Sequence, residues 1–172
     1  MIDAIRELAG SSALPNLHAA MLHFPVALLP VALLLDLACL VVRKKVWLDR
    51  SATLLYVLGT LAAAAAYLTG RNAAGDLWAL PGHVQTTLAD HEDLAMLTLL
   101  AYCITTVLRT IVTWLGREDW KIKIGFFRLL ALIASTASLV LLLLTADRGG
   151  MLVYHYGVGS TPPASAQPPE LR

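Results

Sequence analysis

Charged residues are scarce in this chain of 172 residues: lysine, arginine, aspartate and glutamate make up 15% of it, whereas 58% of its residues are hydrophobic. Soluble domains carry about 25% charged residues, so this composition excludes an ordinary soluble protein and indicates an integral membrane protein. The net charge is only +1. Because no basic field exists beyond the segments that flank apolar runs, a nucleic-acid-binding protein is excluded as well.

Cysteine is almost absent. The two cysteines, Cys39 and Cys103, lie far apart inside apolar runs, which argues against a disulfide or a thiolate metal site and favours simple packing roles. The opening residues 1–16 lack the basic start, apolar stretch and cleavage pattern of a signal peptide, so we expect the first span to be retained. No nucleophile, base and orienting acid form a hydrolytic set, which makes a non-catalytic subunit the preferred interpretation.

Long apolar runs, in contrast, are abundant. Four segments can each cross about 30 Å of hydrocarbon at about 1.5 Å per residue: residues 19–42, 52–69, 93–115 and 126–146. The predicted fold is therefore all-α, an integral membrane up-down four-helix bundle. We divide the chain into an N-terminal periplasmic segment, a transmembrane domain and a proline-rich disordered tail, at residues 1–16, 17–160 and 161–172.

The distribution of basic residues predicts the orientation. The two loops on one side hold eight: Arg43, Lys44, Lys45, Arg50, Arg117, Lys121, Lys123 and Arg128. The other side holds four: Arg6, Arg71, Arg148 and Arg172. Cytoplasmic loops carry the excess of lysine and arginine, so both termini are predicted to be periplasmic, in a multi-pass protein of the bacterial inner membrane.

All five histidines then fall on the periplasmic face: His18, His23, His83, His91 and His155. His23 precedes Arg43 by twenty residues and His91 precedes Trp114 by twenty-three, which places both at the outer edge of the hydrocarbon. The first and third spans are diagonal neighbours in such a bundle, where bundles hold cofactors. This geometry predicts a ligand between His23 and His91.

His18 needs a different partner. It lies five residues before His23, so the two side chains diverge by roughly 140° on a helix, and His91 and His155 are the available partners. The alternative for each histidine is an ordinary polar residue at the water boundary, and this is the preferred interpretation of His83. The apolar neighbours of His23 make that alternative less favourable there.

Asp36 and Arg109 are ionisable residues deep inside the predicted spans. Asp36 and Arg109 have similar depths, so they form an ion pair between the first and third spans, or else Arg109 extends to the interface. Arg109 follows His91 by eighteen residues, about five full turns, and shares its face. Asp36 follows His23 by thirteen, an offset of about 220°, so a straight first span cannot aim both at the same helix.

Other polar residues have two interpretations each. Ser135, Thr136 and Ser138 are assigned to helix packing. The carboxylates of "DHED" (Asp90 to Asp93) could bind a divalent ion or orient an imidazole. Alternatively they cap the first turn of the third span, where acidic side chains complement the helix dipole.

Three stretches resemble one family. "HAAMLHFPVALLP" is similar to the HPxxVHFPxAL opening of a bacterial family of small four-helix membrane proteins of unknown function. "GGMLVYHYGVGS" is similar to its closing GGxLVYxxGVGV, and "DHEDLAMLTLLAY" lies where that family places a histidine. The resemblance covers about residues 15–160. Ala19 replaces the usual proline, and Tyr156 stands where many relatives carry histidine.

The resemblance implies a haem b-binding membrane domain, joined in some relatives to cytochrome c-like modules, with His18, His23 and His91 matching the family's histidines. We expect His23 and His91 as the first axial pair, and His18 with His155 as the second if two haems bind. The glycines of residues 149–159 would bring His155 near the site, and Arg148 could pair with a propionate.

The leading hypothesis is thus a haem b membrane subunit that passes electrons between the quinone pool and a periplasmic or complex-bound partner, such as a cytochrome c or respiratory-complex subunits. The first alternative is a divalent-metal-binding membrane protein or small transporter that uses the outer histidines. The second is a structural anchor of a larger complex.

Overall fold

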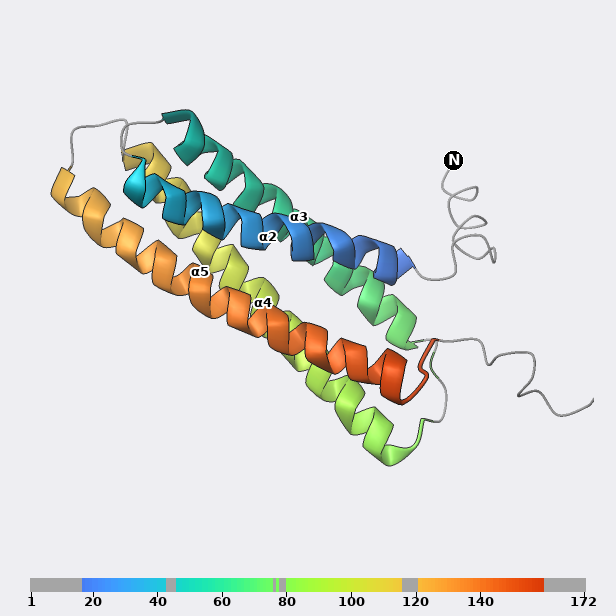
Figure 1. Cartoon of the computed structure of the whole chain (residues 1–172). Coiled ribbons are helices and arrows are strands. Elements are labelled where there is room, and N and C mark those ends of the chain that lie inside the picture. Colours follow the sequence, from blue (N-terminus) through green and yellow to red (C-terminus); the bar gives the residue numbers. More distant parts are fainter. Residues whose placement is uncertain (1–16, 43–45, 76, 78–79, 116–120, 160–172) are drawn as a thin grey trace, which may run out of the picture.

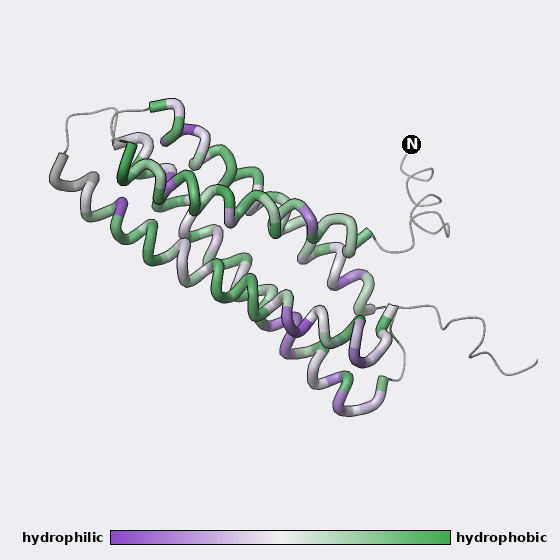
Figure 2. Tube along the Cα trace, in the orientation of Figure 1, coloured by the Kyte–Doolittle hydropathy of each residue, from purple (hydrophilic) through white to green (hydrophobic). Residues whose placement is uncertain are grey.

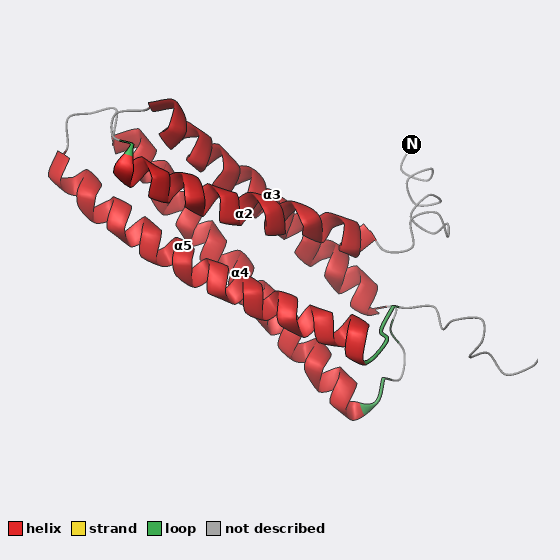
Figure 3. Ribbon diagram, viewed as in Figure 1, coloured by secondary structure: helices red, strands yellow, loops and turns green. Residues whose placement is uncertain are grey.

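The computed structural model describes residues 17–42, 46–75, 77, 80–115 and 121–159, and within these ranges all regular secondary structure is helical (Figures 1 and 3). Four long helices follow one another: α2 (Leu17–Val41), α3 (Val46–Gly75), α4 (Gly82–Leu115) and α5 (Lys121–Gly150). A single turn of π-helix, η1 (Met151–His155), continues α5. The predicted segments 1–16 and 161–172 lie outside the described residues.

The four helices run up and down as a bundle (Figure 1), as predicted. α2 packs on α3 and α4 on α5, and the contacts of α3 with α4 and of α2 with α5 close the ring. The two remaining pairs, α2 with α4 and α3 with α5, are therefore the diagonals. All four helices are long and apolar enough to cross a membrane.

The helices are longer than the predicted spans. The structure corrects one boundary with a consequence for function: α4 begins at Gly82, so the "DHED" carboxylates lie inside the helix and do not cap its first turn. Pro25 and Pro30 lie inside α2 without ending it. Figure 2 shows that hydrophobic residues dominate the middle of the bundle, whereas hydrophilic residues gather toward its two ends.

The interior combines leucines such as Leu29 with many small and hydroxyl-bearing side chains, while other large aliphatic side chains such as Leu34 and Leu61 lie exposed on the outer surface. Hydroxyl pairs join different helices: Tyr56 to Ser135 at 2.6 Å, and Thr105 to Ser138 at 3.1 Å. Such pairs hold membrane helices together where apolar burial gives no driving force. The predicted packing roles of Ser135 and Ser138 are confirmed, whereas the exposed Thr136 bonds within its own helix.

Candidate functional site

Two imidazoles face each other at one end of the bundle. The rings of His18 on α2 and His91 on α4 have their centroids 6.5 Å apart, and their planes meet at 82°. Both side chains are half-buried. Because α2 and α4 are diagonal, the pair lies across the interior of the bundle. We call this end, where α2 begins and α5 ends, the histidine end.

Each imidazole is fixed by the carbonyl of a neighbouring helix. His18 Nδ1 lies 2.8 Å from the carbonyl oxygen of Ala66 on α3, and His91 Nδ1 lies 3.0 Å from that of Thr145 on α5. A carbonyl oxygen only accepts, so each Nδ1 carries the proton and donates it. This leaves the Nε2 lone pair of each ring available to a metal, in the arrangement by which metal-binding histidines are oriented.

A glycine lies against each ring. A Cβ added to Gly70 would come within 2.7 Å of His18 Cε1, and one added to Gly149 within 3.0 Å of His91 Cε1. Gly70 follows Ala66 by four residues, and Gly149 follows Thr145 by four, so one turn of each helix supplies both the carbonyl and the open surface. Gly70 was not among the predicted site residues, because its role depends on how α3 packs against His18.

The structure places His23 elsewhere. Its side chain is exposed, and its Nδ1 donates to the carbonyl of Ala19, 2.8 Å away on the same helix. The expected divergence of His18 and His23 is therefore present, but His18 is the one that turns inward. The predicted His23–His91 pair is thus replaced by His18 and His91.

His155 is not brought to His18. It is exposed on η1, and its ring lies 4.8 Å from that of Tyr156, which in turn lies 5.5 Å from the ring of His83 on α4. The predicted second pair, His18 with His155, is therefore corrected, because His18 is already directed toward His91.

Arg148 lies one residue before the glycine that contacts His91. Its side chain is half-buried, and its Nη1 is 3.7 Å from the sulfur of Met151. This position, beside the imidazole pair at the histidine end, is compatible with the predicted contact to an anionic group.

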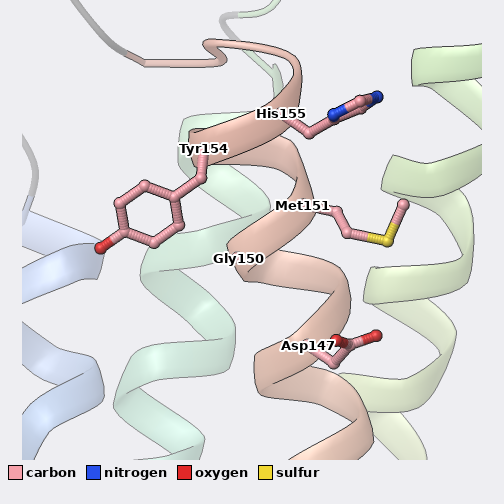
Figure 4. A pocket seen from close by; sticks show the side chains of 5 residues that line it. All are labelled: Asp147, Gly150, Met151, Tyr154 and His155. Carbon is pink, nitrogen blue, oxygen red and sulfur yellow. The ribbon is translucent and has the colours of Figure 1, made fainter.

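An open pocket of about 450 Å³ lies at the same end of the bundle, on the end of α5 and on η1. Its lining residues are Asp147, Gly150, Met151, Tyr154 and His155. Figure 4 shows the side chains of Asp147, Met151 and His155 projecting from one side of the helix and Tyr154 from the other. The π-helical turn Met151–His155 widens the helix here, a feature often found at functional sites.

The family comparison agrees with this architecture. A family model described as "Predicted membrane protein (DUF2231)" matches residues 14–162. The chain belongs to the DUF2231 family. No match was found among curated proteins, and none among solved structures. In this DUF2231 chain, both stretches that resemble the family's opening and closing motifs meet at the histidine end.

A cluster of four charges lies toward the opposite end of this DUF2231 protein. Arg109 Nε is 2.9 Å from Asp36 Oδ1, and both side chains are only 1% exposed. The predicted ion pair is thus confirmed. It is a close contact without hydrogen-bond alignment, since both Asp36 oxygens lack a hydrogen-bond partner among the described residues.

Asp49 and Arg128 complete this charge cluster. Asp49 Oδ1 lies 2.9 Å from Arg109 Nη2 and 2.7 Å from Arg128 Nη2. Thr113 donates to the other Asp49 oxygen at 3.0 Å. Asp49 was not assigned because the second span was expected to begin only at residue 52, whereas α3 begins at Val46.

The described residues contain no group of three or more histidine, cysteine, aspartate or glutamate side chains arranged to hold a metal ion. The "DHED" carboxylates line one stretch of α4, with Asp90 and Asp93 exposed and Glu92 half-buried.

Proposed function

We propose that this multi-pass membrane protein is a haem b-binding electron-transfer subunit and that His18 and His91 are the axial ligands of one haem. The observation that supports this most directly is the separation of the two rings. A metal–imidazole bond is about 2 Å long and a ring centre lies roughly 1 Å behind its nitrogen, so two imidazoles on one iron have centres roughly 6 Å apart. The ring centroids of His18 and His91 lie 6.5 Å apart.

The surroundings of the rings also suit a haem. Both Nδ1 atoms are committed to carbonyl oxygens, so the same nitrogen, Nε2, is free on both sides. Gly70 and Gly149 keep the surface beside each ring open. Arg148 offers a guanidinium for a propionate, a pairing that charge-assisted hydrogen bonds favour. Bound there, haem b would supply a one-electron carrier.

The chain's own residues would set the properties of that carrier. Two histidine ligands from a rigid bundle leave no open coordination position, which favours electron transfer over ligand binding at the metal. The carbonyl oxygens of Ala66 and Thr145 raise the basicity of the imidazoles and fix their planes. These hydrogen bonds therefore adjust the reduction potential as well as holding the ligands.

The proposed electron donor is a membrane quinol, and the acceptor is a periplasmic cytochrome c or a respiratory-complex subunit. The pocket on the outer side of the last turns of α5 and η1 supports the quinol, because it contains a carboxylate and an imidazole, Asp147 and His155. These groups can accept the protons that a quinol releases on oxidation. The excess of basic residues in the opposite loops supports a periplasmic histidine end in a bacterial inner membrane.

The visible spectrum of the purified protein tests the proposal. Protein from haem-replete cells, oxidised by air and then reduced with dithionite, should show a sharp low-spin haem signal. His18→Ala and His91→Ala should each abolish it, and His23→Ala, whose side chain faces outward, is the matched control that should retain it. A colourless preparation, or loss only in His23→Ala, would refute the proposal. Elemental analysis would then separate a metal-binding protein from a structural anchor.

A further inference from the structure

The first and second halves of the bundle are related position by position. On the first diagonal, His18 faces His91 and Asp36 contacts Arg109. In both pairs the second residue comes 73 positions after the first. Leu29 and Tyr102 are separated by the same 73 positions, and both are buried in the core. α2 and α4 therefore occupy equivalent places.

The second diagonal, α3 with α5, shows the same relation, but equivalent residues have a different sequence separation. Asp49 contacts Arg128, and Tyr56 is bonded to Ser135. Both pairs are separated by 79 positions. The carbonyls that hold the imidazoles, Ala66 and Thr145, are also 79 positions apart, as are the two glycines against the rings. The two separations differ by six because the second hairpin is six residues longer between equivalent positions, mainly because α5 begins four residues before the position equivalent to the start of α3.

A residue can contact its own equivalent only on a two-fold axis, as at the centre of a symmetric dimer. Four such contacts exist here, and they extend from the histidine end to the charge cluster. Since His18 and Asp36 are eighteen residues apart, the axis runs for about 27 Å along the bundle. The hairpin α2–α3 and the hairpin α4–α5 are thus pseudo-symmetric halves.

The symmetry is broken at its charged positions. The first hairpin places two aspartates on the axis, Asp36 and Asp49, and the second places two arginines, Arg109 and Arg128. Two copies of the first hairpin would bring aspartate against aspartate, and two copies of the second would bring arginine against arginine. At the Asp36–Arg109 position, where both side chains are 1% exposed, like charges are strongly disfavoured because little water screens them.

We infer that the interface between the two hairpins is a pseudo-two-fold surface. Its four axial charges favour pairing of each hairpin with the other and disfavour pairing of either hairpin with its own copy. The interaction partner that this surface fits is any hairpin of the same kind with the opposite axial charges. The inference rests on the protein's own contacts and does not depend on bound haem.

Three full-length variants test it. Asp36→Arg/Asp49→Arg makes all four axial positions basic, and Arg109→Asp/Arg128→Asp makes all four acidic. The third variant combines all four substitutions and exchanges the charges between the hairpins. We expect the two half-exchanged variants, expressed singly, to lose at least tenfold in yield of monodisperse protein in detergent, and the fully exchanged variant to recover a monomer.

Co-expression distinguishes pairing of hairpins from a general need for charge balance. The basic and acidic variants, carrying different tags, should purify together as a stable complex, since the hairpins of one chain can pair with those of the other. Two differently tagged wild-type chains are the control and should not purify together. The inference is overturned if either half-exchanged variant is a stable monomer, if the full exchange is not recovered, or if co-expression gives no common complex.

Discussion

Gly70 provides the sharpest test of the imidazole pair, because the three atoms nearest to a methyl group added there all belong to the ring of His18. In Gly70→Ala the new Cβ would lie 2.7 Å from His18 Cε1, whereas carbon atoms in contact are about 3.5–4.0 Å apart. The ring must therefore move by roughly 1 Å, and its 2.8 Å hydrogen bond to Ala66 is lost or badly lengthened.

Overpacking of this kind costs about 1–3 kcal/mol, and each 1.4 kcal/mol is a factor of ten in affinity. We therefore expect Gly70→Ala to bind haem about 5- to 150-fold more weakly than the wild type. Gly149→Ala, with its Cβ at 3.0 Å from His91 Cε1, should show a smaller loss. The assay is titration of haem-depleted protein in detergent, followed by the low-spin absorbance and by thermal unfolding.

Two other glycines separate a local effect from a general one. In Gly59→Ala the new Cβ would lie 2.6 Å from Leu29, so this variant adds the same crowding away from the rings. In Gly125→Ala it would meet nothing within 4 Å. Gly59→Ala should unfold more easily without a selective loss of haem, and Gly125→Ala should match the wild type. Wild-type haem affinity in Gly70→Ala, or an equal loss in Gly59→Ala, would refute the role given to Gly70.

Three further predictions follow from the same contacts. With His18 and His91 as ligands of a bound haem, imidazole planes at 82° would leave the two iron orbitals that they engage nearly equal in energy, so the oxidised protein should give a low-field EPR signal of the highly anisotropic type; three resolved rhombic lines would contradict this. Arg109→Met leaves Asp36 buried without its partner and should lower the free energy of unfolding by about 3–5 kcal/mol, with most of it recovered in Asp36→Leu/Arg109→Met; equal losses in both would argue against the pair. Tyr56→Phe removes one interhelical hydrogen bond and should cost about 1 kcal/mol in denaturant unfolding, with haem content unchanged.

The fold was predictable because hydropathy and length alone determine it. In lipid, a chain of this kind satisfies its backbone groups only as helices, and four apolar runs joined by short loops give an up-down bundle. The ends of the helices were harder to predict, since polar residues such as those of "DHED" lie on a helix that extends past the hydrocarbon. Asp49 was missed for the same reason, since α3 begins before the predicted second span. Arg128 lies within the predicted fourth span but was counted only among the basic residues of the adjoining loop.

The sequence contained enough information to predict that His18, and not His23, faces the interior of the bundle. The depth estimate from Arg43 and Trp114 treated the two loop boundaries as level and favoured His23. Helical rotation favoured His18 instead. His23 and Asp36 are thirteen residues apart and cannot lie on the same face of a helix, whereas His18 and Asp36 are eighteen residues apart, which is five full turns, and share a face. Contacts from other helices, such as the Ala66 carbonyl and Gly70, could not be found this way, because they depend on how α3 packs.

The buried ion pair explains why the imidazoles can meet at all. α2 and α4 have no sequence connection that fixes their relative height, and an apolar interface in lipid tolerates sliding and rotation. Sliding or rotation of α2 against α4 would separate Asp36 from Arg109, which is unfavourable because both charges are buried. With that contact made, five turns of each helix lead to a histidine, at the same height and on the facing side. A shift of α2 by one residue would turn the His18 ring by about 100° and break its hydrogen bond to the Ala66 carbonyl. The charge cluster thus sets the register of a site about 27 Å away.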